Sequence, residues 1–213
     1  MKTEDLVTML ATGSLAVEPN GAARRYGVAL VCGAFGSALL MAVLLGVRPD
    51  LGQAVLLPMF WTKFAYVACL ALTSAILALR LSRPGRRLGG IPSALAVTVI
   101  AMWMLAALVL TSADPTERRQ LLFGGTSTTC PFFISILSVP VFLAAIWAMK
   151  GLAPTRLRLA GAAAGLVSGS LGALVYSLHC PEMAAPFLGV WYLLGVLIPT
   201  GVGALLGPRL LRW

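Results

Sequence analysis

Charged residues are scarce in this chain: they make up 11% of its 213 residues, whereas hydrophobic residues make up 59%. The mean hydropathy is +0.93. This balance excludes an ordinary soluble domain. The seven acidic residues all fall outside the long apolar stretches: Glu4, Asp5, Glu18, Asp50, Asp114, Glu117 and Glu182. Ion-coupled carriers place ionisable groups within the bilayer, so this distribution argues against transport.

The chain also lacks the alternating ten-residue pattern of a membrane β-barrel. It has instead six apolar runs of about 20 residues, the length that crosses a bilayer as an α-helix. We therefore predict an all-α, polytopic membrane protein with six transmembrane helices. Their expected ranges are 26–47, 56–79, 91–112, 130–149, 157–178 and 186–207.

The basic residues predict the orientation of these helices. With both termini in the cytoplasm, twelve Lys and Arg fall in inner segments and three in outer loops, as the positive-inside rule requires. We expect an N-in, C-in topology. The formal net charge of +9 is then a feature of topology that faces anionic membrane lipids, and no direct nucleic-acid partner is implied. Lys63, near the outer end of the second run, is expected to snorkel to the outer interface.

Little of the chain remains outside the membrane, which leaves no room for a catalytic domain. We predict a cytoplasmic tail over 1–25, a membrane domain over 26–208 and a short cytoplasmic end over 209–213. Only the tail is long enough to bind a cytosolic protein. It begins as a short amphipathic helix, which can bind in a groove of a partner or rest on the membrane surface.

Several residues give this helix its pattern. Thr3 can cap it, while Glu4 and Asp5 favour its positive first turn. Leu6 and Leu10 lie one turn apart on one side. These five residues are the candidate binding determinant.

Two cysteines lie where apolar runs meet the outer side. Cys130 opens the fourth run, with Pro131 in its first turn, and Cys180 closes the fifth, before Pro181. Consecutive antiparallel spans place these ends side by side. The positive end of the fourth helix favours Cys130 as the more reactive thiol.

Three interpretations of this pair are open. It is a structural disulfide, a regulatory thiol pair, or part of a metal site. The metal site would use sulfur, imidazole and carboxylate ligands from Cys130, His179, Cys180 and Glu182. No CxxC motif is present, which weakens a thiol-oxidoreductase interpretation.

The fifth run carries Gly161, Gly165 and Gly169 at four-residue spacing. Small residues at this spacing let membrane helices approach closely. We therefore expect this face to pack against a neighbouring span.

Several motifs together resemble the NrsF-type family, negative regulators of a sigma factor F. They are Met1–Leu6 (MKTEDL), Gly46–Leu51 (GVRPDL), Leu152–Arg156 (LAPTR), Ser177–Glu182 (SLHCPE), Trp191–Tyr192 and Arg209–Trp213 (RLLRW). The resemblance runs along the whole chain. It implies a six-span anti-sigma factor of the bacterial inner membrane, which sequesters an extracytoplasmic-function sigma factor. Cys130 and Cys180 match the family's two outward-facing cysteines, so release would follow an oxidative or heavy-metal signal.

Two rival classes are considered. A quinone-linked membrane thiol oxidoreductase would use Cys130 and Cys180 as its exchanging pair, but it normally needs a second thiol pair or a polar quinone site. A small-molecule carrier would need a polar midplane. The sequence shows none of these features, so we expect no enzyme activity and no cofactor.

Overall fold

The computed structural model describes residues 3–12, 21–83, 85 and 87–212. All regular secondary structure in these residues is helical. Six helices are long and apolar enough to cross a membrane, which confirms the predicted all-α, six-span architecture. They are α2 (Gly21–Leu44), α4 (Pro58–Leu81), α5 (Ile91–Ser112), α7 (Thr129–Lys150), α8 (Leu157–Tyr176) and a last span over Ala185–Leu210.

The last span is continuous but not uniform. It joins a single turn, α9 (Ala185–Phe187), a π-helical segment, η1 (Leu188–Tyr192), and α10 (Leu193–Leu210). A π-helical turn inside an α-helix widens it locally and is frequent at functional sites.

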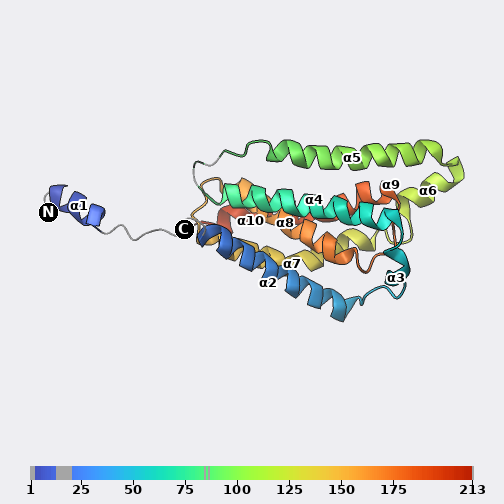
Figure 1. Ribbon diagram of the computed structural model, residues 1–213, viewed down its shortest axis with the longest axis horizontal. Coiled ribbons are helices and arrows are strands. Elements are labelled where there is room, and N and C mark those ends of the chain that lie inside the picture. The colour runs from blue at the N-terminus through green and yellow to red at the C-terminus, as the bar shows by residue number, and fades with distance from the viewer. Residues whose placement is uncertain (1–2, 13–20, 84, 86, 213) are drawn as a thin grey trace.

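Three short helices lie outside the spans: α1 (Thr3–Thr12), α3 (Leu51–Ala54) and α6 (Pro115–Phe123). Helix α1 is the predicted N-terminal helix, and it lies outside the six-helix bundle (Figure 1). Helix α6 was not predicted; it begins with Pro115 in its first turn, a position that proline favours. The first span begins at Gly21, earlier than the predicted boundary at residue 26.

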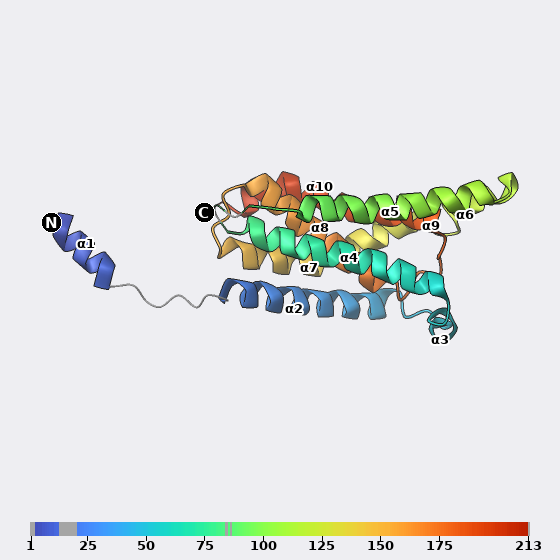
Figure 2. The ribbon, with the colours of Figure 1, turned by 45° about the horizontal axis from the view of Figure 1, so that its top comes forward.

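Helix α8 is the centre of the bundle. It packs against α10, α7 and α4, and 67% of its most apolar stretch is buried, compared with 11% for α5 (Figures 1 and 2). Helix α5 lies at the periphery, packed mainly against α4 and α9. The most hydrophobic span is therefore the one most exposed to lipid, whereas the glycine-rich span forms the protein core.

Glycines bring α8 and α10 into backbone contact. A side chain at Gly161 would collide with the carbonyl of Gly203, and one at Gly165 would collide with the carbonyl of Pro199. On another face, a methyl group at Gly172 would lie 2.9 Å from the carbonyl oxygen of Ile134 in α7. The predicted small-residue face is confirmed as the contact with α10, and Gly172 gives α8 a second close contact, with α7.

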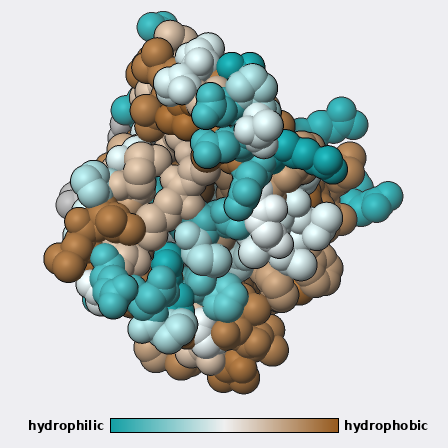
Figure 3. Space-filling model, turned by 90° about the vertical axis from the view of Figure 1, so that its right-hand side faces the viewer, coloured by the Kyte–Doolittle hydropathy of each residue, from teal (hydrophilic) through white to brown (hydrophobic). Residues whose placement is uncertain are grey.

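The antiparallel order of the spans gives the bundle two distinct ends. The termini end holds the start of α2, the C-terminus and the connections after α4 and α7 (Figure 1). The cysteine end holds the connections that follow α2, α5 and α8. Figure 3 views the cysteine end, where hydrophilic residues spread across the surface and hydrophobic ones gather near its edges.

Candidate functional site: a buried thiol pair

The structure brings Cys130 and Cys180 together at the cysteine end. Cys130 lies in the first turn of α7, and Cys180 lies four residues after α8 ends at Tyr176. Both are free cysteines, and both are fully buried, with 0% exposure. The two thiols lie within hydrogen-bonding range of each other. The side-by-side placement predicted from antiparallel spans is therefore confirmed.

Local backbone geometry holds each cysteine in place. The amide of Cys180 donates to the carbonyl of Tyr176 at 3.0 Å, so the chain makes one more turn after α8 before Pro181 ends it. The amide of Cys130 donates to the carbonyl of Thr126 at 2.9 Å, which ties the start of α7 to its preceding loop.

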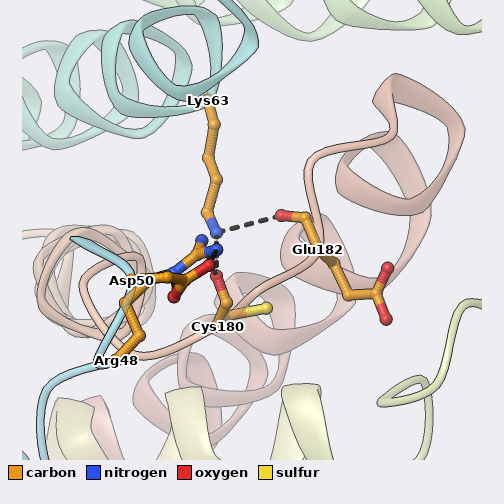
Figure 4. Close-up of polar contacts among 5 residues, drawn as sticks. All are labelled: Arg48, Asp50, Lys63, Cys180 and Glu182. Atoms are coloured by element: carbon orange, nitrogen blue, oxygen red, sulfur yellow. Dashed lines mark hydrogen bonds and ion pairs between the residues drawn. The ribbon is translucent and has the colours of Figure 1, made fainter. Parts of the chain in front are cut away.

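Two cations converge on the backbone at Cys180. The Nζ of Lys63, in α4, donates to the carbonyl oxygens of Cys180 at 2.8 Å and of Glu182 at 3.0 Å (Figure 4). The Nη1 of Arg48 lies 3.4 Å from the same Cys180 oxygen, while its Nη2 forms a salt bridge with Asp50 at 2.6 Å. Lys63 is 0% exposed. The prediction that it snorkels to the outer interface was wrong, because two carbonyls satisfy its ammonium inside the protein.

Aromatic rings close the site on the side of the last span. Tyr192, in η1, stands with its ring centroid 5.2 Å from the Lys63 Nζ and 5.9 Å from the ring of Tyr176. Its hydroxyl is buried with no hydrogen-bond partner among the described residues, and it lies near Cys180. The π-helical turn thus presents an unsatisfied donor to the thiol pair.

This environment stabilises a thiolate at Cys180. The hydrogen bond from Cys130 and the positive charge of Lys63 hold the pKa of Cys180 well below its usual range, although burial opposes them. A thiolate is the nucleophilic form of cysteine. The sequence favoured Cys130 as the more reactive thiol, whereas in the structure it is the backbone of Cys180 that the Lys63 ammonium contacts.

The four residues of the predicted metal site are not gathered as a ligand set. The Nδ1 of His179 donates to the carbonyl of Gly46 at 2.9 Å, and the carboxylate of Glu182 accepts from the amide of Gly125 at 2.7 Å. Within the described residues, no group of three or more His, Cys, Asp or Glu side chains is placed to hold a metal ion.

Glu182 instead fastens two loops. Gly124 has a φ of +50° and lies directly against Glu182. A methyl group at Gly124 would lie 2.6 Å from the Glu182 carboxyl carbon, which is too close. The loop before Cys130 is thereby joined to the loop after Cys180. Trp191 adds a second link: its indole nitrogen donates to the carbonyl of Leu122, in α6, at 2.8 Å.

The sequence argument missed Lys63, Arg48 and Tyr192 as parts of this site. One signal was present: Lys63 is a lone cation within an apolar run, and such residues are functional candidates by default. Its partners are backbone carbonyls far along the chain, which no motif marks.

The predicted partner-binding residues lie in α1. Thr3, Glu4 and Asp5 form its first turn, and the hydroxyl of Thr8 donates to the carbonyl of Glu4 at 2.8 Å. The backbone at Leu6 and Leu10 is helical, but their side chains lie outside what the structure describes. The remainder of the predicted tail over 13–20 also lies outside the described residues.

Taken together, these features define a six-span membrane protein with a buried thiol pair at one end of the bundle. Comparison with known proteins identifies the family of this chain. It belongs to the family described as "NrsF: Negative regulator of sigma F", which matches residues 10–213.

Two relatives match over the full length of both chains. A protein of Azospira oryzae named "Probable anti-sigma-F factor NrsF" is 58% identical over 213 residues, and one of Caulobacter vibrioides named "Anti-sigma-F factor NrsF" is 42% identical over 217 residues. No solved structure matches the chain. The resemblance predicted from the motifs is confirmed.

Proposed function

We propose that this protein is an anti-sigma factor that sequesters an extracytoplasmic-function sigma factor at the bacterial inner membrane. The sigma factor binds the N-terminal segment over 1–25, and an oxidative or heavy-metal signal at Cys130 and Cys180 releases it. In this proposal the termini end faces the cytoplasm and the cysteine end faces the periplasm. The two relatives, both named anti-sigma-F factors, support the sigma-factor partner.

The observation that carries the proposal is the juxtaposition of Cys130 and Cys180. Fifty positions apart in the chain, they meet in a hydrogen bond at the cysteine end. The connection between their helices, the turn from α7 to α8, lies at the termini end. A covalent change at the thiol pair therefore acts on α7 and α8 together. The opposite ends of these two helices lie near the start of α2 (Figure 1).

The orientation has an electrostatic argument. The connections at the termini end carry Arg80, Arg83, Arg87 and Arg156, which surround a hollow of about 320 Å³. Basic connections on the cytoplasmic side follow the positive-inside rule and suit a leaflet of anionic lipids.

Co-purification from bacterial membranes tests the proposal. The full chain, tagged at its C-terminus, should retain a sigma factor in mild detergent, identified by mass spectrometry. Treatment with hydrogen peroxide, chromate or Cd²⁺ should release it. A variant lacking residues 1–20, which precede α2, should insert in the membrane but retain none. Absence of any sigma factor from the intact complex would overturn the proposal.

A further inference from the structure

We propose that Lys63 is a positioning residue that holds Cys180 as the attacking thiolate, so that Cys130 acts as the resolving thiol toward a small two-electron oxidant such as a peroxide. This inference rests on the proposed function, because it assigns roles within the same thiol pair. It also identifies the class of signal: an oxidant that forms a disulfide, in preference to a coordinated metal ion.

The first argument is the missing counter-charge of Lys63. It is completely buried, and a buried ammonium is costly unless it is paired. The one salt bridge among the described residues is that between Arg48 and Asp50. The carboxylate of Glu182 points away from Lys63 and accepts from Gly125 (Figure 4).

The second argument is the number of acceptors. An ammonium has three donors, and the Lys63 Nζ has the carbonyls of Cys180 and Glu182 and the ring face of Tyr192 around it. These neutral groups satisfy its hydrogens but supply no negative charge. A thiolate at Cys180, whose own carbonyl already accepts from Lys63, supplies one.

The surroundings of Cys180 agree on the sign of its charge. The titratable and charged groups acting on it are Cys130 of α7, Lys63 of α4, Arg48 of the loop before α3, Tyr176 of α8, Tyr192 of η1 and Glu182 of its own loop. Two of these are cations, and three are neutral donors. Of the two nearby carboxylates, that of Asp50 is paired with Arg48 at 2.6 Å and that of Glu182 is turned toward Gly125.

The reaction then follows from the closeness of the two sulfurs. The Cys180 thiolate attacks one oxygen of hydrogen peroxide; the O–O bond breaks, hydroxide leaves, and Cys180 becomes a sulfenic acid. Cys130 loses its proton as its sulfur attacks the Cys180 sulfur; the S–O bond breaks, water leaves, and the disulfide forms. The two cysteines lose two electrons, and the peroxide is reduced to water and hydroxide.

Disulfide formation has a consequence for α4. The negative charge at Cys180 disappears, while Lys63 remains buried beside it. The uncompensated ammonium weakens the contact of α4 with the loop after α8, and α4 leads directly to the basic connection at the termini end. Lys63 thus links the redox state of the thiols to a second helix besides α7 and α8.

The test measures disulfide formation in the purified full chain in detergent, with Cys32 and Cys69 replaced by alanine. Hydrogen peroxide is the oxidant, at pH 6 to 9, and non-reducing mass spectrometry follows the linked peptides.

Lys63→Met should slow the reaction at least about tenfold at pH 6, since each unit of increase in pKa lowers the thiolate fraction about tenfold. The difference should close toward pH 9. Lys63→Arg should restore the rate, and Arg119→Met, an exposed cation at the same end, should leave it unchanged.

The parent chain provides a second measurement if Lys63→Met does not fold. Its rate should be nearly flat from pH 6 to 9; a tenfold rise per pH unit, as for an ordinary thiol, would overturn the role of Lys63. A Lys63→Met rate reduced equally at every pH would also overturn it, because a merely structural defect has no pH dependence. If the parent forms no disulfide under any condition, the redox part of the proposed function fails together with this inference, whereas sigma-factor binding is unaffected.

Discussion

Ser37 of α2 and Leu137 of α7, one hundred positions apart, are joined by a buried hydrogen bond: the Ser37 hydroxyl donates to the Leu137 carbonyl at 2.7 Å. Leu137 belongs to the turn before Pro140, whose missing N–H frees the carbonyl of the adjacent residue 136 and whose ring disturbs that turn. Neighbouring helices can support the backbone around a proline in a membrane helix. Ser37 thus gives the disturbed turn an additional bond from a second helix.

Replacing Ser37 tests this compensation. Ser37→Ala should lower the free energy of unfolding by about 0.6 to 1.7 kcal/mol, the range measured for hydrogen bonds between membrane helices. Thermal unfolding in detergent would measure it. Ser135→Ala serves as the control, because the Ser135 hydroxyl donates within its own helix, to Pro131. Equal effects of the two changes would contradict the interhelical role.

Glycine substitutions on α8 and α10 should have opposite outcomes. Gly165→Ala places a methyl group against the backbone of Pro199, so α8 and α10 must separate; overpacking of this kind costs about 1–3 kcal/mol or more. Gly201→Ala, with nothing within 4 Å of its new methyl group, should be neutral or stabilising. The midpoint of thermal unfolding distinguishes them. A Gly165→Ala variant as stable as the parent would show that the helices separate easily.

The N-terminal helix should carry the sigma-binding determinant. Leu6→Asp combined with Leu10→Asp should release the sigma factor while the six spans stay folded, because truncating one apolar anchor at a hot spot costs about 2 kcal/mol or more. That loss lowers affinity roughly 30-fold per anchor. Co-purification with the double variant measures it, and Thr8→Asp, on the opposite side of the helix, is the control. Undiminished sigma-factor recovery with the double variant would direct attention to the connection around residues 83–87.

The cysteines should be required for signalling but not for insertion. Cys130→Ser and Cys180→Ser should each abolish the response of a sigma-dependent reporter to oxidant or metal, since a disulfide, or a metal ion bound between the two thiols, needs both sulfurs. Cys32→Ser and Cys69→Ser, at lipid-exposed positions, should respond like the parent. Normal responses from both Cys130→Ser and Cys180→Ser would show that the pair is structural only.

The salt bridge at the cysteine end predicts a pH dependence of stability. The hydrogen bond from Arg48 holds the pKa of Asp50 below its usual value of about 3.9. A lowered pKa stabilises the folded state above the usual value, and that contribution is lost as the pH falls through the folded-state pKa. Asp50→Asn should therefore lower stability at pH 7, and its difference from the parent should shrink below about pH 4. Thermal unfolding at both pH values measures this, with Asp114→Asn as the control; a difference independent of pH would contradict it.

Some of the site was predictable from local pattern. The positions of Cys130 and Cys180 at opposite ends of consecutive spans were enough to place them together, because antiparallel helices joined by a short connection have few alternatives. The role of Lys63 was not predictable in this way. Its environment depends on the path of the loop after Cys180, and the expectation of snorkelling assumed that water was the only available partner.

The sequence by itself determined the class and the architecture of this protein. Apolar runs long enough to cross a bilayer must become helices, since lipid offers no partner for backbone polar groups, and the family motifs lie along the whole chain. Only the tertiary structure decided which glycines meet which helix, and that Lys63 is buried with its ammonium on the backbone of Cys180. These features depend on contacts between residues far apart in the chain, where charge and burial are set by neighbours that no local pattern specifies.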